Sequence, residues 1–306
     1  MRVIVTGGTG AIGGPLLRRL HAAGHDVTVV IRNPRNRDLI TRAGAQPVVA
    51  DVLDRDGLLS AVSGLTADAI MHQATALRSA RRRLRPDDPT GRLRTEGTAH
   101  LIDVAHAVGA RRFVAQSLIT GYGYRDHGQR MLTEADRFGV TVGSVADLVA
   151  TTTQTAEQQV FAAPGIDGIA LRYGMFYGPK AFSDLFAELM RKHVPVVPRN
   201  GGGHTGFIHI EDAAAAAVTA LEAGRPDTAY NIVDDTPVTW GEFCAAVARA
   251  HRTPKPIALP GWLLRLAMPY LGCLMIDTDL RVSNALAAEE LGWRPQYSSI
   301  EEGLTV

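Results

Sequence analysis

The chain has 306 residues, 46% of them hydrophobic and 21% charged, which is enough for one large α/β domain with a smaller domain attached. The 32 lysines and arginines almost balance the 31 aspartates and glutamates, which excludes a globally basic surface for nucleic acid and favours a small-molecule substrate. The two cysteines, Cys244 and Cys273, are too few for a disulfide scaffold and too widely spaced for a metal knuckle, so we expect a reducing compartment and no metal site.

The first half of the chain alternates short apolar runs with segments of helical periodicity. Helices are predicted, for example, over residues 15–24 and 97–110. Apolar strands that alternate with helices pack as a parallel sheet covered on both faces, so we expect an α/β, Rossmann-type doubly wound fold. Runs rich in β-branched residues predict its strands at 2–7, 26–32, 45–51, 68–74, 111–117 and 165–174.

The second half of the chain is less regular. Helices are predicted over residues 181–193 and 239–251, and a short strand over 230–235. The most apolar stretch, residues 258–276, contains Arg265 and two prolines and would make a poor membrane span. We therefore expect a cytoplasmic protein with no membrane partner.

No repeats and no low-complexity linker separate the two halves, so the second unit is expected to pack directly against the first. The sequence carries no signal for an oligomeric state. The expected division is a Rossmann domain at residues 1–178 plus about 207–237, and a smaller, mainly helical substrate domain at about 179–206 plus 238–306.

The stretch TGGTGAIG at residues 6–13 lies where a strand is predicted to end and a helix to begin. In that context Gly7 allows a tight turn, Gly10 lets a pyrophosphate approach the backbone, and Gly13 permits close packing of the helix on the sheet. The helix N-terminus would face the negative charge of the phosphates. An ordinary glycine-rich turn is the alternative, and the position between strand and helix favours a dinucleotide site.

Several segments resemble, in the same order, the extended short-chain dehydrogenase/reductase family, also labelled NAD-dependent epimerase/dehydratase. The resemblance covers nearly the whole chain. Besides the glycine-rich turn, the segments that carry it are ADVLD at 50–54, DAIMHQAT at 68–75, EGTAHLIDVAHAVGARRFV at 96–114, LRYGMFYGP at 171–179, FIHIEDAAAA at 207–216 and LGWRP at 291–295.

The resemblance implies roles for residues along a cofactor groove. Asp51 would accept a hydrogen bond from the adenine amino group, the Val52 backbone would meet the ring, and Ala74 and Thr75 would line the groove. A cap on the following turn is the alternative role for Asp51. The residues expected at the cofactor are Gly7, Thr9, Gly10, Ala11, Ile12, Arg32, Asp51, Val52, Ala74, Thr75, Ser117, Tyr173, Gly174 and Phe176.

The end of the second predicted strand bears on the choice of cofactor. Enzymes that use NAD usually place an acidic residue there, about twenty residues after the glycine-rich turn, to bond the ribose hydroxyls. This chain has Arg32 at that place, followed by Arg35 and Arg37. A guanidinium binds a 2′-phosphate through paired charge-assisted hydrogen bonds, so we expect NADPH (NADP+ when oxidised); solvated loop arginines are the alternative.

The catalytic residues that the resemblance would imply are missing. In the family a tyrosine gives a proton to the substrate oxygen and a lysine four residues later lowers the pKa of that tyrosine, but these positions fall on Val149 and Thr153. The family's serine falls on Leu118, one residue after Ser117, and its asparagine on Arg94. Valine cannot donate a proton and threonine cannot carry the cation, so we predict an atypical member without the usual proton relay.

Two residues remain as catalytic candidates beside the nicotinamide. Tyr173 lies in LRYGMFYGP at the end of the sixth strand, and its phenol could donate a proton or pack against the cofactor ring. Ser117 could contact substrate or cofactor, or serve packing alone. Tyr122 and Tyr124, which follow the fifth strand, are weaker candidates.

Two further patterns have both a functional and a structural interpretation. His209 and Asp212 could form a relay pair, although the matching family segment positions a helix against the sheet. The five arginines between residues 78 and 85 could recognise an anionic substrate, although such runs are commonly solvated.

Together these features predict an NADPH-dependent ketoreductase for an aromatic polyketide-type ketone in antibiotic biosynthesis, similar to angucyclinone ketoreductases that also lack the tyrosine and lysine. A phenol beside such a ketone can stabilise the alkoxide that hydride transfer creates, so the substrate supplies its own acid. A redox-inactive NADP(H)-binding sensor and a nucleotide-sugar epimerase or dehydratase are the alternatives.

Overall fold

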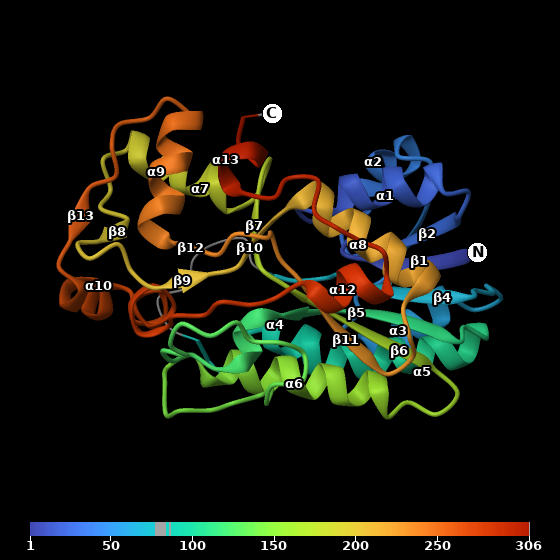
Figure 1. The fold of residues 1–306 in the computed structure, drawn as a ribbon. Helices are drawn as coiled ribbons and strands as arrows, with labels where there is room; N and C mark the ends of the chain where they lie inside the picture. The colour runs from blue at the N-terminus through green and yellow to red at the C-terminus, as the bar shows by residue number, and fades with distance from the viewer. Residues whose placement is uncertain (77–83, 86, 306) are drawn as a thin grey trace.

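A seven-stranded parallel sheet forms the centre of the computed structural model, which describes residues 1–76, 84, 85 and 87–305 (Figure 1). The strand order is β11-β6-β5-β4-β1-β2-β3. All six strands expected in the first half are present, and the short strand expected in the second half joins the same sheet as β11. The strands are β1 (Arg2–Thr6), β2 (Asp26–Ile31), β3 (Gln46–Val49), β4 (Ala69–His72), β5 (Arg112–Leu118), β6 (Asp167–Tyr173) and β11 (Thr228–Ile232).

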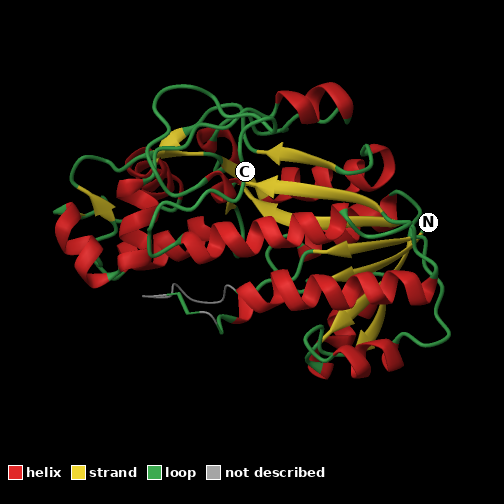
Figure 2. Cartoon of the chain, turned by 90° about the horizontal axis from the view of Figure 1, so that it is seen from below, coloured by secondary structure: helices red, strands yellow, loops and turns green. Residues whose placement is uncertain are grey.

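Helices cover both faces of this sheet (Figures 1 and 2). On one face Leu16 of the first helix shares a core with Val29 of β2, and on the other face Leu101 shares a core with Phe113 of β5. The expected Rossmann-type α/β class is thus confirmed. The first face carries α1 (Gly13–Ala22), α2 (Arg37–Arg42) and α8 (Ile210–Ala223), and the second carries α3 (Arg55–Ala61), α5 (Thr98–Val108) and α6 (Asp147–Phe161).

The sheet reverses its strand order between β1 and β4. β1 pairs with β2 on one side and with β4 on the other. After β1 the chain continues outward to β2 and β3, whereas after β4 it continues to β5 and β6 on the other side of the sheet. Such a switch point opens a crevice at the carboxyl ends of the strands, where ligands bind in open α/β sheets. The candidate site is therefore built from the segments that follow β1, β4, β5 and β6.

A second unit packs beside this edge of the sheet, around a core of aromatic side chains. The Phe207 and Phe243 rings stack with centroids 4.3 Å apart, and Trp240 and Phe186 pack around them. Its helices are α7 (Phe182–Arg191), α9 (Trp240–Ala250), α10 (Gly261–Ala267), α11 (Pro269–Gly272) and α13 (Ile300–Gly303). Three short strand pairs accompany them: β7 (Met175–Tyr177) with β10 (Phe207–His209), β8 (Val197–Pro198) with β13 (Ala258–Leu259), and β9 (His204–Thr205) with β12 (Val238–Thr239).

Two segments pack across the expected domain boundaries. Phe207 belongs to the aromatic core of the second unit, whereas Leu291 and Trp293 of the tail pack into the core under α1 and α8. The division itself stays a prediction. In the described part of the chain no helix is long and apolar enough to cross a membrane. The remaining short helices are η1 (Pro34–Asn36), α4 (Pro89–Arg92), η2 (Leu93–Gly97), η3 (Ile119–Tyr122), η4 (Cys273–Asp277) and α12 (Ala285–Glu290).

Candidate active site at the carboxyl edge of the sheet

The turn between β1 and α1 has the backbone geometry of a phosphate site. Gly7 has a φ of 84°, and a Cβ there would lie 2.3 Å from the carbonyl oxygen of Gln73, so only glycine fits. Gly10 is exposed and leaves the outer side of the turn open. The backbone N–H groups of Ala11 and Ile12 have no hydrogen-bond partner in the described chain and lie just before α1. A phosphate would find unpaired donors and a helix N-terminus here.

Gly13 packs differently from the expectation. A Cβ on Gly13 would lie 2.2 Å from the carbonyl oxygen of Gly8, so the helix start is pressed against the turn and not against the sheet. Gly8 makes the contact with the sheet, because a Cβ there would lie 2.7 Å from Val29 Cγ1 on β2. Sequence reasoning had not singled out Gly8, the second glycine of the TGG run.

Arg32 directly follows β2 and is exposed. It forms no hydrogen bond or ion pair with any residue that the structure describes, and neither Arg35 nor Arg37 forms an ion pair there. Unpaired guanidinium groups at this place fit a 2′-phosphate. The preference for NADPH over NAD stays a prediction.

Asp51 forms the cap that was the alternative role, and its contact with adenine stays a prediction. Its Oδ1 accepts a hydrogen bond of 3.0 Å from the Leu53 N–H, which caps the turn after β3. Its second carboxylate oxygen accepts no hydrogen bond from a described residue, so it could still bind an adenine amino group. Val52 is buried beside Gly97, and its carbonyl is 2.9 Å from Nδ1 of His100.

A small cavity lies between the ends of β4 and β5 and the start of α5. Its volume is about 10 Å³, which is enough for one small polar group. The Thr98 hydroxyl is buried and has no hydrogen-bond partner among the described residues. The cavity is lined by His72, Ala74, Thr75, Arg94, Thr98 and Gln116. The structure thus brings two expected groove residues, Ala74 and Thr75, together with the residue at the family's asparagine position.

His72, which lines this cavity, contacts β1 and the η2 turn through its two ring nitrogens. Its Nε2 lies 3.0 Å from the carbonyl oxygen of Leu93, and its Nδ1 lies 2.8 Å from the Thr6 hydroxyl. A carbonyl can only accept, so Nε2 carries the proton and Nδ1 accepts from Thr6. Burial, with a smaller contribution from the neighbouring Arg94, lowers the pKa of His72 to about 4, so the ring is neutral.

Arg94 reaches the cavity from η2, a π-helical turn between α4 and α5. Only 8% of Arg94 is exposed, yet it forms no hydrogen bond or ion pair with any described residue. Burial lowers the pKa of its guanidinium, whereas Tyr124, Tyr270 and Asp88 act in the opposite direction; arginine stays protonated in proteins under such conditions. The sequence indicated Arg94 only as the residue at the expected asparagine position, and its burial with no partner among the described residues is visible only in three dimensions.

The helix α6 carries the positions expected for the family's tyrosine and lysine. Val149 and Thr153 are both buried, and the Thr153 hydroxyl donates a 2.6 Å hydrogen bond to the Val149 carbonyl of its own helix. Neither side chain presents an acidic proton or a cation. Leu118, at the expected serine position, is half-buried and packs against the core of the second unit.

Ser117 lies inside a buried polar network. Its hydroxyl donates to Glu157 of α6, which forms an ion pair with Arg172 of β6 at 2.7 Å. Arg172 also donates a 3.0 Å hydrogen bond to the Tyr122 hydroxyl, which donates in turn to Asn231. This geometry matches the packing alternative for Ser117, and a contact with substrate or cofactor stays a prediction. Tyr122 is likewise committed to the network.

Tyr173 is completely buried at the end of β6. Its ring centroid lies 5.2 Å from that of Phe176, and its hydroxyl has no hydrogen-bond partner among the described residues. Burial raises the pKa of the phenol well above its ordinary value. Gly174 next to it is required by close packing, since a Cβ would lie 2.7 Å from the Gly206 carbonyl oxygen. A catalytic role for Tyr173 stays a prediction.

Two other phenols meet where the second unit touches the Rossmann unit. Tyr124, after β5, and Tyr270, on α11, have hydroxyl oxygens 3.3 Å apart. Burial raises the pKa of both, so both are neutral proton donors near neutral pH. Sequence reasoning ranked Tyr124 low and did not consider Tyr270, because 146 residues separate the pair along the chain.

His209 and Asp212 do not form a hydrogen-bonded relay. The two Asp212 carboxylate oxygens accept backbone N–H bonds of 3.0 Å from Gln296 and Tyr297, which holds the tail on α8. His209 caps the start of α8, with its Nδ1 accepting from the Glu211 N–H at 3.3 Å. These contacts agree with the structural interpretation of the FIHIED segment.

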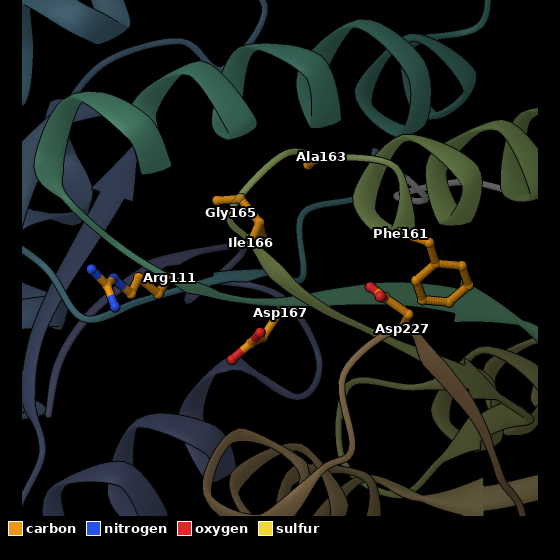
Figure 3. A pocket seen from close by; sticks show the side chains of 7 residues that line it. All are labelled: Arg111, Phe161, Ala163, Gly165, Ile166, Asp167 and Asp227. Carbon is orange, nitrogen blue, oxygen red and sulfur yellow. The ribbon is translucent and has the colours of Figure 1, made fainter.

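A second, open hollow lies at the opposite end of the sheet. It is formed around the starts of β5, β6 and β11, as Figure 3 shows, away from the carboxyl edge where ligands bind in such folds. Its lining residues are Arg111, Phe161, Ala163, Gly165, Ile166, Asp167 and Asp227.

Of the five arginines in the run at 78–85, all but Arg85 lie outside the described residues. Arg85 is exposed, and its Nε lies 3.5 Å from the Asp87 carboxylate.

Known proteins resemble the chain over most of its length. The family model described as NAD dependent epimerase/dehydratase family matches residues 3–233. A Streptomyces protein named 3-diazoavenalumate denitrifying reductase is 36% identical, with 99% of each chain covered. A Stigmatella aurantiaca ketoreductase named for a farnesylated quinoline oxide is 28% identical over 79% of this chain and 71% of its own. The structure of a human epimerase family protein with NADPH superposes with a TM-score of 0.78 at 20% identity, covering 100% of this chain and 98% of that one.

Proposed function

Since the chain belongs to the NAD dependent epimerase/dehydratase family and is an NAD(P)-dependent oxidoreductase, we propose that it is an NADPH-dependent reductase of an aromatic small molecule in antibiotic biosynthesis. One observation carries the proposal. Val149 and Thr153 occupy the α6 positions where an acidic tyrosine and its lysine are expected. Both are buried, valine has no proton to donate, and the threonine hydroxyl donates to its own helix. The acceptor must therefore be one whose reduction does not need that acid.

The groove at the carboxyl edge fits the cofactor. The open turn at Gly10, with its unpaired backbone donors, suits the pyrophosphate, and the unpaired Arg32 suits the 2′-phosphate. Asp51 and Val52 would hold the adenine, and Ala74, Thr75 and Phe176 would border the rest of the groove. When bound, NADPH supplies a hydride. The protein's own contribution is to orient the substrate and exclude water.

An aromatic ketone with a neighbouring phenol is the first acceptor that fits. The phenol hydrogen-bonds the oxygen on which negative charge develops, and a bond that strengthens only in the transition state lowers the barrier. A relative named as the ketoreductase of a farnesylated 3-oxo-dihydroquinoline oxide supports a ring ketone fused to an aromatic ring as the acceptor. The phenol of the substrate then takes the place of the missing tyrosine.

An aromatic diazo compound is the second acceptor, and the relative with 36% identity over nearly its full length favours it. An arenediazonium group is already positively charged. Addition of a hydride neutralises it, and loss of dinitrogen leaves the arene, so atoms and charge balance without any proton from the protein. This chemistry also agrees with an α6 helix that lacks an acid.

The alternatives fit less well. Epimerases and dehydratases of this family depend most on the tyrosine that Val149 has displaced. A redox-inactive sensor would not need the polar cavity beside Thr98, in which an arginine is buried with no ion-pair partner among the described residues.

The test is to supply the purified protein with NADPH and with either an ortho-hydroxyaryl ketone or an ortho-hydroxyarenediazonium salt. Consumption of NADPH is followed by absorbance, and release of dinitrogen by mass spectrometry. We expect turnover with at least one acceptor, and dinitrogen release in step with NADPH consumption identifies the second class. Tight NADPH binding with no turnover of either acceptor would favour the sensor and refute the proposal.

A further inference from the structure

We propose that Arg94 is the anion-binding residue of the substrate site, and that it selects aromatic substrates that present a negatively charged oxygen to the cavity beside Thr98. The chemical class is a phenolate or carboxylate oxygen on an aromatic ring, separate from any neutral phenol that donates to a ketone acceptor. The inference rests on the proposed function in one respect, namely that this groove takes an aromatic substrate.

The contrast between two buried arginines carries the inference. Arg172 is 5% exposed and forms two hydrogen bonds with Glu157 and one with Tyr122. Arg94 is 8% exposed and forms no hydrogen bond or ion pair within the described chain. A charge that is removed from water without a partner costs several kcal/mol, and arginine does not escape the cost by losing its proton. Among the described residues no carboxylate is paired with Arg94, although Asp88 acts on it from a distance, so a ligand can supply the missing counter-ion.

The backbone turn directs Arg94 inward. Arg92, two residues earlier, points outward and forms an exposed ion pair with Glu96 at 2.7 Å. The π-helical turn η2 places Arg94 on the other side, at the cavity. The His72 ring donates to the Leu93 carbonyl and the Thr95 hydroxyl donates to the Gly91 carbonyl, so the turn is anchored on both sides of Arg94. π-helical turns of this kind are frequent at functional sites.

Among the described residues the surroundings of Arg94 contain several hydrogen-bond donors, and none of these residues forms an ion pair with it. His72 is neutral, and the Thr98 hydroxyl is free to donate into the cavity. Tyr124 and Tyr270 are neutral phenols close enough to act on the charge of Arg94. The carboxylate that acts on Arg94 is Asp88, which forms no ion pair with it and whose Oδ1 accepts the backbone N–H of Thr90 at 2.9 Å.

The cavity size limits what binds there. A volume of about 10 Å³ accepts a single oxygen-bearing group and no aromatic ring, so the ring must lie outside it, toward the cofactor groove. A phenolate or carboxylate held in this way would fix the ring relative to the nicotinamide. The cation that the family places on α6 would thus be replaced by one from η2, which packs against α6.

The test measures binding without turnover, on the full chain saturated with NADP+. The probes are p-nitrophenol, 4-nitrobenzoate and the uncharged p-nitroanisole. We expect the protein to bind p-nitrophenol as the phenolate, with the visible absorption of the ionised form appearing at lower pH than for the free probe. Arg94→Met should weaken binding of the preferred anion about ten- to hundredfold and abolish that spectral shift. If Arg94→Met weakens binding of p-nitrophenolate more than that of 4-nitrobenzoate, Arg94 prefers a phenolate. The opposite order indicates a carboxylate.

Two further variants separate anion binding from a structural role. Arg94→Lys keeps the charge and should retain part of the affinity and of the spectral shift, and Arg92→Gln, the matched exposed control, should change neither. Thermal unfolding of Arg94→Met should occur no lower than for the unaltered protein, because an uncompensated charge has been removed. Unchanged binding of both anions in Arg94→Met, or an equal loss for p-nitroanisole, would overturn the inference. Phenolate binding through Arg94 in a protein that reduces neither acceptor would reject only the proposed function.

Discussion

The Arg172 guanidinium meets the Glu157 carboxylate through hydrogen bonds of 2.9 and 2.7 Å, and both side chains are buried. The pair joins α6 to β6 one helical turn beyond Thr153. The helix on which the family's acid and cation are expected is therefore held against the sheet, with Val149 and Thr153 at the expected positions. Ser117 donates to the same carboxylate and adds β5 to the connection.

We predict that Glu157→Gln lowers the free energy of unfolding by about 3 to 5 kcal/mol, because Arg172 would remain as a buried charge without its counter-ion. Urea denaturation measures the change. Glu96→Gln is the matched control, since Glu96 pairs with Arg92 on the surface, and the expected loss is less than about 1 kcal/mol. Similar small losses in both variants would mean that the buried pair contributes little.

Replacing Arg32 with Asp should weaken NADPH binding by more than about tenfold while sparing NADH, because the exposed guanidinium after β2 would no longer meet the 2′-phosphate. Fluorescence titration with both cofactors measures the two affinities. Arg42→Asp, at the far end of α2, makes the same charge change and should affect neither. Equal losses for NADPH and NADH in Arg32→Asp would contradict the assignment of Arg32.

Thr153→Ala should change turnover by less than about tenfold, which is what lost positioning alone can cost. The physical reason is that the Thr153 hydroxyl already donates to the Val149 carbonyl of its own helix, a bond that serves no reacting group. Steady-state kinetics and NADPH affinity should be measured together. A collapse of kcat with intact NADPH binding would show that Thr153 takes part in the chemistry.

For a hydroxyaryl ketone, masking the phenol as a methyl ether should lower kcat about ten- to hundredfold while binding weakens less, because a charge-assisted hydrogen bond of the transition state is lost. Tyr173→Phe supplies the contrast. The Tyr173 hydroxyl is buried and unpartnered among the described residues, so its removal should leave most of the rate intact. If the methyl ether is reduced as fast as the phenol but Tyr173→Phe abolishes the reaction, the proton donor is Tyr173 of the protein and not the substrate phenol.

His72 should make stability depend on pH in the acidic range. Its pKa falls from 6.5 to about 4 on folding, chiefly through burial, so between these values the unfolded chain binds a proton that the folded chain does not. The stabilisation is complete above pH 6.5 and is lost as the pH falls, by about 3 kcal/mol in total. Urea denaturation at several pH values should show a shallower pH dependence in His72→Gln. Parallel curves for the two proteins would contradict the prediction.

Local sequence patterns determined much of this protein. The strands and the glycine-rich turn are predictable because side-chain periodicity and backbone freedom act over a few neighbouring residues. The prediction that the tyrosine and lysine are absent is equally local, since it compares residues 149 and 153 with the resemblance alone. The Rossmann class followed from the alternation of such segments.

Only the tertiary structure decided which side chains are paired. Ser117 meets Glu157 across 40 residues, and Tyr124 meets Tyr270 across 146, contacts that no local pattern encodes. Sequence could not distinguish Arg172, which has a carboxylate partner, from Arg94, which has none among the described residues, because such a partner is brought up by distant parts of the chain. The free energy of a buried charge depends on what long-range folding places around it, and at Arg94 the described chain places donors and no ion-pair partner.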